Sequence, residues 1–387
     1  MGTLTARGAQ LMRLAHERPG LTRADAARAL GAGTGTTADL VARLAGEHLL
    51  HERPAPPSGT RGRPTRHLVA HPTGPLVLGA AVSHEDWRVA ALELGGGLLR
   101  TERGTHDGRD GTAVLRAVRA AAGRLHRRFP GRVRGLGLAV PGPVHDGHVL
   151  DATILGWRAL DLRAAAPAPV PDAGGHGRAS ADVFVAGNDA TLAAVGEARR
   201  GAATGAAAHL HLHVDAGLGG ALTTGGHPLA GARGQAGEFG HVPLGDPAVR
   251  CPCGARGCWG TTVDGTALAR TLGDPAPADP VSYARRVLDR AAAGEDGPLR
   301  AARAAGTSLG RGTGGLVNAL DADLVTLGGL GARLLEVVPD EVRGACSEAL
   351  MGFRRDTPPA LLPAALGDDG PLVGAAEQVW SRLWDLL

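Results

Sequence analysis

The sequence predicts an α/β fold with two similar halves and a cleft between them, preceded by a small helical domain. From residue 72 onward, short apolar runs end in glycine-rich turns and lead into stretches with helical spacing, and this order occurs twice. Before residue 70, three short amphipathic segments precede two strand-like runs. The 387 residues suffice for two to three domains, which we place at 1–70, 71–190 and 191–387, with the last helices free to pack back on the first lobe.

The first seventy residues have the pattern of a helix-turn-helix followed by a wing. Thr22 can cap a helix whose first turn carries Asp25, and the turn Gly31-Ala32-Gly33 separates it from a further helix. A helix, a short glycine turn and a second helix form the arrangement found in many DNA-binding domains. The predicted elements are helices over 3–17, 23–30 and 34–47, a strand near 49–50, and a returning strand over 66–69.

Positive charge concentrates in the same segment. Residues 1–70 carry ten arginines against five acidic residues, a net charge of +5, whereas the whole chain is +3. The second helix of such a pair enters the major groove, and a basic wing can reach a minor groove. We therefore predict binding to double-stranded DNA, with a small helical interaction domain as the alternative. The predicted contacts are Thr34, Thr36, Thr37, Arg43, Arg61 and Arg63.

The rest of the chain supplies the strands and helices of the two halves. Residues 166–180, rich in proline, alanine and glycine, predict a mobile surface loop. The sequence shows neither a signal stretch nor a run of 18 apolar residues, so we expect a cytoplasmic protein without a membrane partner. Strands are predicted over 76–82, 87–94, 98–101, 133–140, 183–185, 209–214, 218–223 and 324–327, and helices over 111–128, 190–200, 263–318 and the remaining C-terminal residues.

Three of the four cysteines lie close together, with a histidine ten residues before the first of them. The residues are His241, Cys251, Cys253 and Cys258, and three thiolates with one imidazole form the ligand set of a closed structural zinc site. Free cysteines packed as small hydrophobes, or a disulfide, are the alternatives. The glycine- and proline-rich loop favours Zn²⁺, and a closed site is expected to hold the loop rather than to catalyse.

The motif Gly237-Glu238-Phe239-Gly240-His241, followed by the three cysteines, closely resembles the ROK family of sugar kinases and sugar-responsive repressors. The resemblance extends over nearly the whole chain and implies an actin-like, ribonuclease-H-like fold in two lobes. Members with an N-terminal winged helix-turn-helix are transcription regulators. Weaker supporting motifs are Leu138 to Val144, Leu155-Gly156-Trp157, Asn188-Asp189-Ala190, Gly217 to Gly220, Gly231 to Ala236, and Asp323 to Gly329.

The resemblance also implies a sugar site. It assigns sugar hydroxyls to Asn188 and Asp189, with the aspartate as general base in the kinases, and further sugar contacts to Glu238 and His241. His241 would then serve as a zinc ligand as well. Carboxylate and amide groups suit hydroxyls, which both donate and accept hydrogen bonds. Without the family context, Asn188-Asp189 would be interpreted as a turn with helix capping.

Two phosphate-binding turns of the kinases are altered here. Residues 81–85 stand where the family has an Asp-x-Gly-Gly-Thr turn, and the second turn begins with Asp215. Acidic side chains and lost glycines oppose ATP binding, so we expect no ATP and no kinase activity. The sugar side differs too, because Gly260 replaces a glutamate that reaches the sugar and Ile154 replaces a polar residue.

Taken together, these features predict a DNA-binding transcription regulator, most simply a repressor. A sugar or sugar derivative would bind in the cleft between the lobes, and the chain would act as a homodimer or homotetramer. Two alternatives remain open: an active ROK-type sugar kinase, and a regulator that has lost ligand binding.

Overall fold

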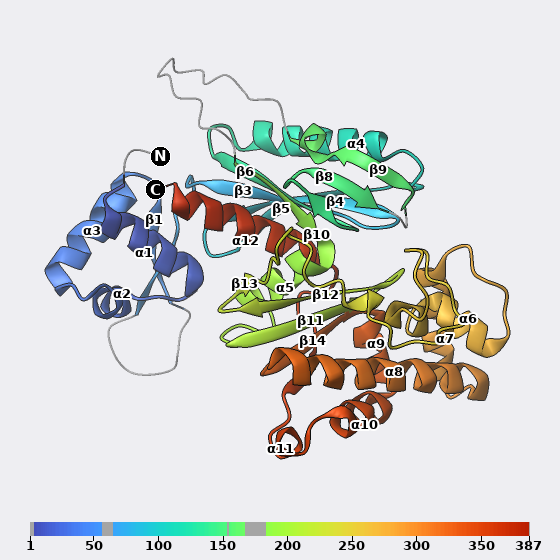
Figure 1. The fold of residues 1–387 in the computed structure, drawn as a ribbon. Coiled ribbons are helices and arrows are strands. Elements are labelled where there is room, and N and C mark those ends of the chain that lie inside the picture. Colours follow the sequence, from blue (N-terminus) through green and yellow to red (C-terminus); the bar gives the residue numbers. More distant parts are fainter. Residues whose placement is uncertain (1–3, 56–64, 153–154, 167–182, 387) are drawn as a thin grey trace.

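The computed structural model describes residues 4–55, 65–152, 155–166 and 183–386. Figure 1 shows a helical N-terminal part, residues 4–70, beside a body of two lobes. The predicted mobile loop lies almost wholly outside the described residues, as does Ile154. Within the described part of the chain, no helix is long and apolar enough to cross a membrane.

The N-terminal part contains the predicted helix-turn-helix and paired strands. Its elements are α1 (Ala6–Glu17), α2 (Arg23–Leu30), α3 (Thr34–Gly46), β1 (Leu50–Pro54) and β2 (Arg66–Ala70), the two strands being antiparallel. Thr22 and Asp25 form a capping box, in which each side chain accepts a hydrogen bond from the other residue's backbone N–H. Gly31 ends α2 in the left-handed region, at φ 57°, which permits the sharp turn toward α3.

The first lobe is a mixed sheet with strand order β10-β6-β3-β4-β5. The strands are β3 (Leu76–Val82), β4 (Asp86–Glu93), β5 (Leu98–Thr105), β6 (Val133–Val140) and β10 (Val183–Asn188). Helix α4 (Gly111–Arg128) packs on one face and α12 (Gly370–Asp385) on the other. At Gly79 and Gly137 a Cβ atom would overlap carbonyl groups of α12, so this helix lies directly on the sheet backbone.

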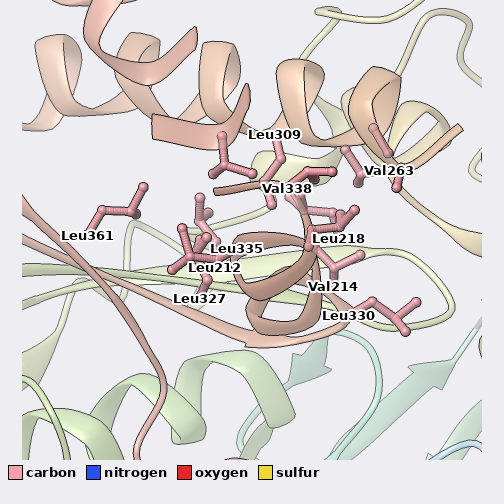
Figure 2. Close-up of a cluster of buried hydrophobic side chains, with 14 of the residues drawn as sticks. Leu212, Val214, Leu218, Val263, Leu309, Leu327, Leu330, Leu335, Val338 and Leu361 are labelled. Atoms are coloured by element: carbon pink, nitrogen blue, oxygen red, sulfur yellow. The ribbon is translucent and has the colours of Figure 1, made fainter. Parts of the chain in front are cut away.

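The second lobe repeats this plan with strand order β13-β12-β11-β14-β15. Its strands are β11 (Ala208–Val214), β12 (Leu218–Thr224), β13 (His227–Pro228), β14 (Leu324–Gly329) and β15 (Ala360–Pro363). Its helices are α5 (Asp189–Arg200), α6 (Gly265–Leu272), α7 (Pro280–Ala292), α8 (Asp296–Leu320), α9 (Leu330–Val337), α10 (Pro339–Ala349) and α11 (Gly352–Arg355). Leu212, Leu309 and Leu327 lie in its buried core, between the sheet and α8 (Figure 2).

Helices α5 and α12 lie between the two sheets and pack against each other (Figure 1). α12 contacts β3 and β6 of the first lobe, whereas α5 contacts β11 and β12 of the second. This two-lobed arrangement is the actin-like α/β fold that the sequence predicted, and that prediction is confirmed.

Two features of the fold were not predicted from the sequence. A small sheet of β7 (Val144–His145), β8 (Val149–Ala152) and β9 (Trp157–Asp161) follows β6. The prediction that helices fill the C-terminal residues was wrong at β15, which pairs in parallel with β14. β15 has four residues and lies at the edge of its sheet, too short to give a periodic signal.

Candidate functional site

The predicted metal ligands come together in one loop of the second lobe. His241 Nδ1 lies 3.8 Å from Cys251 Sγ, and Cys253 Sγ lies 3.7 Å from Cys258 Sγ. All four ligand atoms lie within 4.8 Å of one another. Zinc–sulfur bonds of about 2.3 Å in a tetrahedron place two sulfurs about 3.8 Å apart, so the donor set fits Zn²⁺. Within the described residues these cysteines are free, and the disulfide alternative is unsupported.

The loop is anchored to the core of the lobe by the residue after its last cysteine. Trp259 is fully buried, and its indole Nε1–H donates to Ser308 O on α8 at 3.1 Å. A Cβ atom at Gly312 would overlap the Trp259 ring, so helix and ring are in direct contact. A metal that fixes the cysteines therefore also fixes the loop against α8.

The root of this loop faces the space between the lobes. Helix η3 (Phe239–His241) places Glu238 and His241 side by side, with Glu238 Oε2 3.7 Å from His241 Nε2. The other ring nitrogen, Nδ1, points to the cysteines. A carboxylate on the outer nitrogen of a metal-bound histidine fixes the orientation of the ring. Both side chains are about half exposed, so they remain accessible to a ligand.

A cavity of about 220 Å³ begins at these two side chains. It runs between the lobes, with Pro141 and Leu155 on the first lobe and the loop from His241 to Cys253 on the second. Of the predicted sugar ligands, Asp189, Glu238 and His241 line it. Gly260 lines it as well and presents no side chain there.

Asn188 is engaged elsewhere. Its Oδ1 accepts from Thr191 N at 3.1 Å as the cap of α5, and its Nδ2 donates to Gly142 O at 3.3 Å. It is not among the residues that line the cavity. Asn188 therefore caps helix α5 in this structure. Its role as a sugar ligand stays a prediction.

Asp189 occupies the first position of α5, where the strand β10 ends. Its Oδ1 accepts from Ala190 N at 2.7 Å. Burial raises the pKa of Asp189 to about 6, although nearby His213 opposes the shift. A carboxyl group with such a pKa can take up and release a proton near neutrality.

Sequence reasoning missed His213 and Asp264 as residues of the site. His213 lines the cavity because β11 alternates, bringing His209, His211 and His213 to the same face. That period of two was visible in the sequence and could have placed His213 in the cleft. Asp264 caps α6, accepting from Ala267 N at 2.8 Å, while lining the cavity beside Gly260.

A second cavity, of about 540 Å³, adjoins the first, and Asp189 and Asp215 line both. It contains the altered turn at 83–85, which faces the second lobe. His84 Nδ1 lies 3.3 Å from Asp215 Oδ2, and this neighbouring carboxylate raises the pKa of His84, although burial opposes the shift. Glu85 Oε1 lies 3.5 Å from Arg285 Nη1 on α7. These contacts thus join the first lobe at His84 and Glu85 to the second lobe at Asp215 and Arg285.

The N-terminal part presents some of the predicted DNA contacts and not others. Thr34, Thr36 and Arg43 are exposed on α3, and Arg43 is paired with Glu47 at 2.9 Å. Thr37 was predicted wrongly, because it is 1% exposed and its hydroxyl donates to Gly33 O at 3.0 Å inside the helix. The predicted wing residues Arg61 and Arg63 lie outside the described residues.

Comparisons with known proteins agree with this geometry. A model of the ROK family matches residues 84–381. The chain is 32% identical over 256 residues to a kanosamine kinase of Amycolatopsis mediterranei (strain S699). This alignment covers 65% of this chain and 78% of the kinase. It is 25% identical over 254 residues to a xylose repressor of Bacillus subtilis (strain 168), covering 65% of this chain but only 62% of that repressor.

Among solved structures, a ROK family transcriptional regulator described as a homologue of the E. coli MLC protein superposes with a TM-score of 0.73. The superposition covers 98% of this chain and 96% of that one, at 18% sequence identity. At this identity the likeness establishes the fold, including the N-terminal part.

Proposed function

The chain belongs to the ROK family, and from this premise we propose that it is a DNA-binding transcriptional repressor controlled by a sugar in the inter-lobe cleft. Residues 1–70 bind double-stranded operator DNA. The residues proposed to contact it are Thr34, Thr36, Arg43, Arg61 and Arg63. The lobes over 71–190 and 191–387 enclose the effector. The protein acts in the cytoplasm as a homodimer or homotetramer, so that paired N-terminal parts meet paired half-sites.

The observation that carries this proposal is the pair of contacts between the lobes, His84 with Asp215 and Glu85 with Arg285. They lie at the two segments that stand where the kinases have phosphate-binding turns. Phosphoryl transfer requires backbone donors and a metal arranged around the phosphates. Here the carboxylates of Glu85 and Asp215 occupy that place, paired with Arg285 and His84. A nucleotide would have to break both pairs and bring its own negative charge beside two carboxylates.

The sugar side of the cleft supports the sensing role. Asp189, Glu238 and His241 surround a cavity of suitable size for a monosaccharide, while structural Zn²⁺ bound by His241, Cys251, Cys253 and Cys258 holds the loop in place. Known relatives act on or respond to xylose and kanosamine, so the effector class is a pentose, a hexose or an amino sugar.

The test begins with DNA selected from a random-sequence pool by the purified chain. The full chain should enrich one sequence with two related half-sites, and the chain lacking residues 1–70 should enrich none. A sugar panel is then screened by thermal shift and by its effect on binding to the selected DNA. Failure of the full chain to enrich any sequence would overturn the repressor proposal.

A sugar kinase is the second candidate, and a specific observation favours it. Asp189 sits between the two cavities with a pKa near 6, which suits a general base, and a kanosamine kinase is among the relatives. The assay is sugar-dependent release of ADP from ATP. Turnover that Asp189→Ala abolishes would establish the kinase. Intact DNA binding without stabilisation by any sugar would instead indicate a regulator that has lost its ligand.

A further inference from the structure

A buried ionic cluster ties the N-terminal part to the body. It consists of His16 on α1, Arg200 at the end of α5, and Glu377 on α12, whose side chains are 3%, 10% and 4% exposed. Arg200 Nε donates to Glu377 Oε1 at 2.7 Å, and Arg200 Nη1 donates to the backbone oxygen of His16 at 2.7 Å. His16 Nε2 lies 2.9 Å from Glu377 Oε2.

The first lobe takes part in the same cluster. Gly95, in the turn between β4 and β5, donates its backbone N–H to His16 Nδ1 at 3.0 Å. The rings of Trp380 and Trp384 cover His16, with centroids 5.2 and 5.7 Å from it. Since four separate segments meet here, a displacement of any of them changes how α1 is held.

One of these segments begins in the sugar cavity. Helix α5 runs from Asp189, which lines the cavity, to Arg200, which enters the cluster. Its twelve residues span about 18 Å at about 1.5 Å per residue. The neighbouring Arg199 also reaches α1, with its Nη1 3.8 Å from Glu17 Oε1. The same helix therefore contacts the effector site at one end and the N-terminal part at the other.

Helix α5 cannot shift without α12. A Cβ atom at Gly374 would overlap Leu192 O, and one at Gly196 would overlap Gly370 O, so the two backbones are in contact. The buried carboxylate of Glu197 on α5 also accepts from Leu366 N at 2.7 Å, just before α12. The two helices thus form one rigid unit whose far end carries both Arg200 and Glu377.

We propose that α5 conveys occupancy of the sugar cavity to the DNA-binding part, and that His16, Arg200 and Glu377 form the contact through which it acts. This inference rests on the proposed function and names its route. A ligand that favours one position of Asp189 favours the corresponding position of Arg200, and so of α1 and the recognition helix α3. A ligand shifts such an equilibrium only by its differential affinity for the two positions.

The decisive variant is His16→Asn. The asparagine Oδ1 can still accept from Gly95 N, and the buried Arg200–Glu377 pair remains whole. The substitution removes the contacts of His16 Nε2 with Glu377 and with Arg200 Nη2, which lies 2.8 Å away. Glu377→Gln is the second variant, and Glu341→Gln is the matched control, because Glu341 pairs with Arg303 at the surface of the second lobe. Hydrogen exchange is measured on the full chain without sugar.

In His16→Asn we expect amide exchange over 6–17 to rise about tenfold, with residues 238–258 unchanged. The rate of amide exchange over residues 6–17 should also change when Asp189→Asn is made in the wild-type protein. It should not change when Asp189→Asn is added to the His16→Asn variant. Unchanged exchange over 6–17 in both cluster variants, or an equal response to Asp189→Asn in both backgrounds, would overturn the proposal. These readouts require neither DNA nor sugar, so their failure is distinct from failure of the repressor function.

The functional arm uses D-xylose, D-glucose and D-glucosamine as probes, with the selected DNA. His16→Asn should keep any thermal stabilisation by a probe and lose the effect of that probe on DNA affinity. If His16→Asn keeps the full effect of a probe on DNA affinity, the proposed route is wrong even though the repressor proposal stands.

Discussion

Replacing Asp189 by asparagine should stabilise the protein at neutral pH. Burial raises the pKa of this carboxyl group from 3.8 to about 6 in the folded chain, so its charged form is disfavoured there. At about 1.4 kcal/mol per pKa unit, that difference corresponds to about 3 kcal/mol. Asparagine carries no charge, and its Oδ1 can still accept the hydrogen bond from Ala190 N. The substitution should therefore recover up to about 3 kcal/mol.

The sign of the effect sets its pH dependence. Below about pH 4 the carboxyl group is protonated in both the folded and the unfolded chain, and the variant has no advantage. Between about pH 4 and pH 6 the unfolded chain ionises while the folded chain does not, so wild type loses stability relative to the variant. Above the folded pKa of about 6 the advantage of the variant is full and constant.

The measurement is urea denaturation of both proteins from pH 4 to pH 8, compared as the difference in free energy of unfolding. Asp246→Asn serves as the control, since Asp246 is exposed and accepts from Ala248 N at 2.8 Å. An advantage of Asp189→Asn that is equal at pH 4 and pH 8, or absent at both, would refute the reasoning. A stabilising loss of function is the expected signature of a residue kept for its chemistry.

Three further predictions concern the metal, the helix interface and the DNA. Elemental analysis should find about one zinc per chain, and a chelator or Cys253→Ser should lower the melting temperature; well-folded protein without metal would contradict this. Gly137→Ala should destabilise the chain by about 1–3 kcal/mol in urea denaturation, because its Cβ overlaps α12, whereas Gly35→Ala in open space on α3 should not destabilise it. DNA affinity should fall steeply with salt, and Thr36→Val should weaken it more than Thr37→Val, as measured by fluorescence anisotropy; a greater loss at Thr37 would contradict its burial.

Local sequence signals predicted the parts whose partners are close in the chain. The predicted metal ligands fall within eighteen residues, and spacing alone indicated that they form one cluster. Spacing also predicted the Thr22 cap, although not the reciprocal hydrogen bond from Thr22 N to Asp25. The wrong assignment of Thr37 had a visible signal, since Thr37, Val41 and Leu44 share one helical face and are all buried. At this position the helical period, rather than the polarity of the side chain, indicates burial.

Distant partners gave no comparable signal. His16 and Glu377 are separated by 361 positions, and nothing in the sequence around either residue indicates the other. The cross-lobe pair of Glu85 with Arg285 likewise depends on how the lobes are placed. The sequence shows acidic residues at Glu85 and Asp215, but their pairing with Arg285 and His84 became visible only in the fold.

The docking of α12 on the first sheet has a consequence for how the chain is made. Strands β3 and β6 are synthesised more than two hundred residues before α12, yet they bury their glycine face only against that helix. Until α12 leaves the ribosome, the face stays open, and the long separation slows its closure. A nascent chain can therefore form its helix-turn-helix early, but the buried cluster of His16, Arg200 and Glu377 is complete only after α12 has left the ribosome.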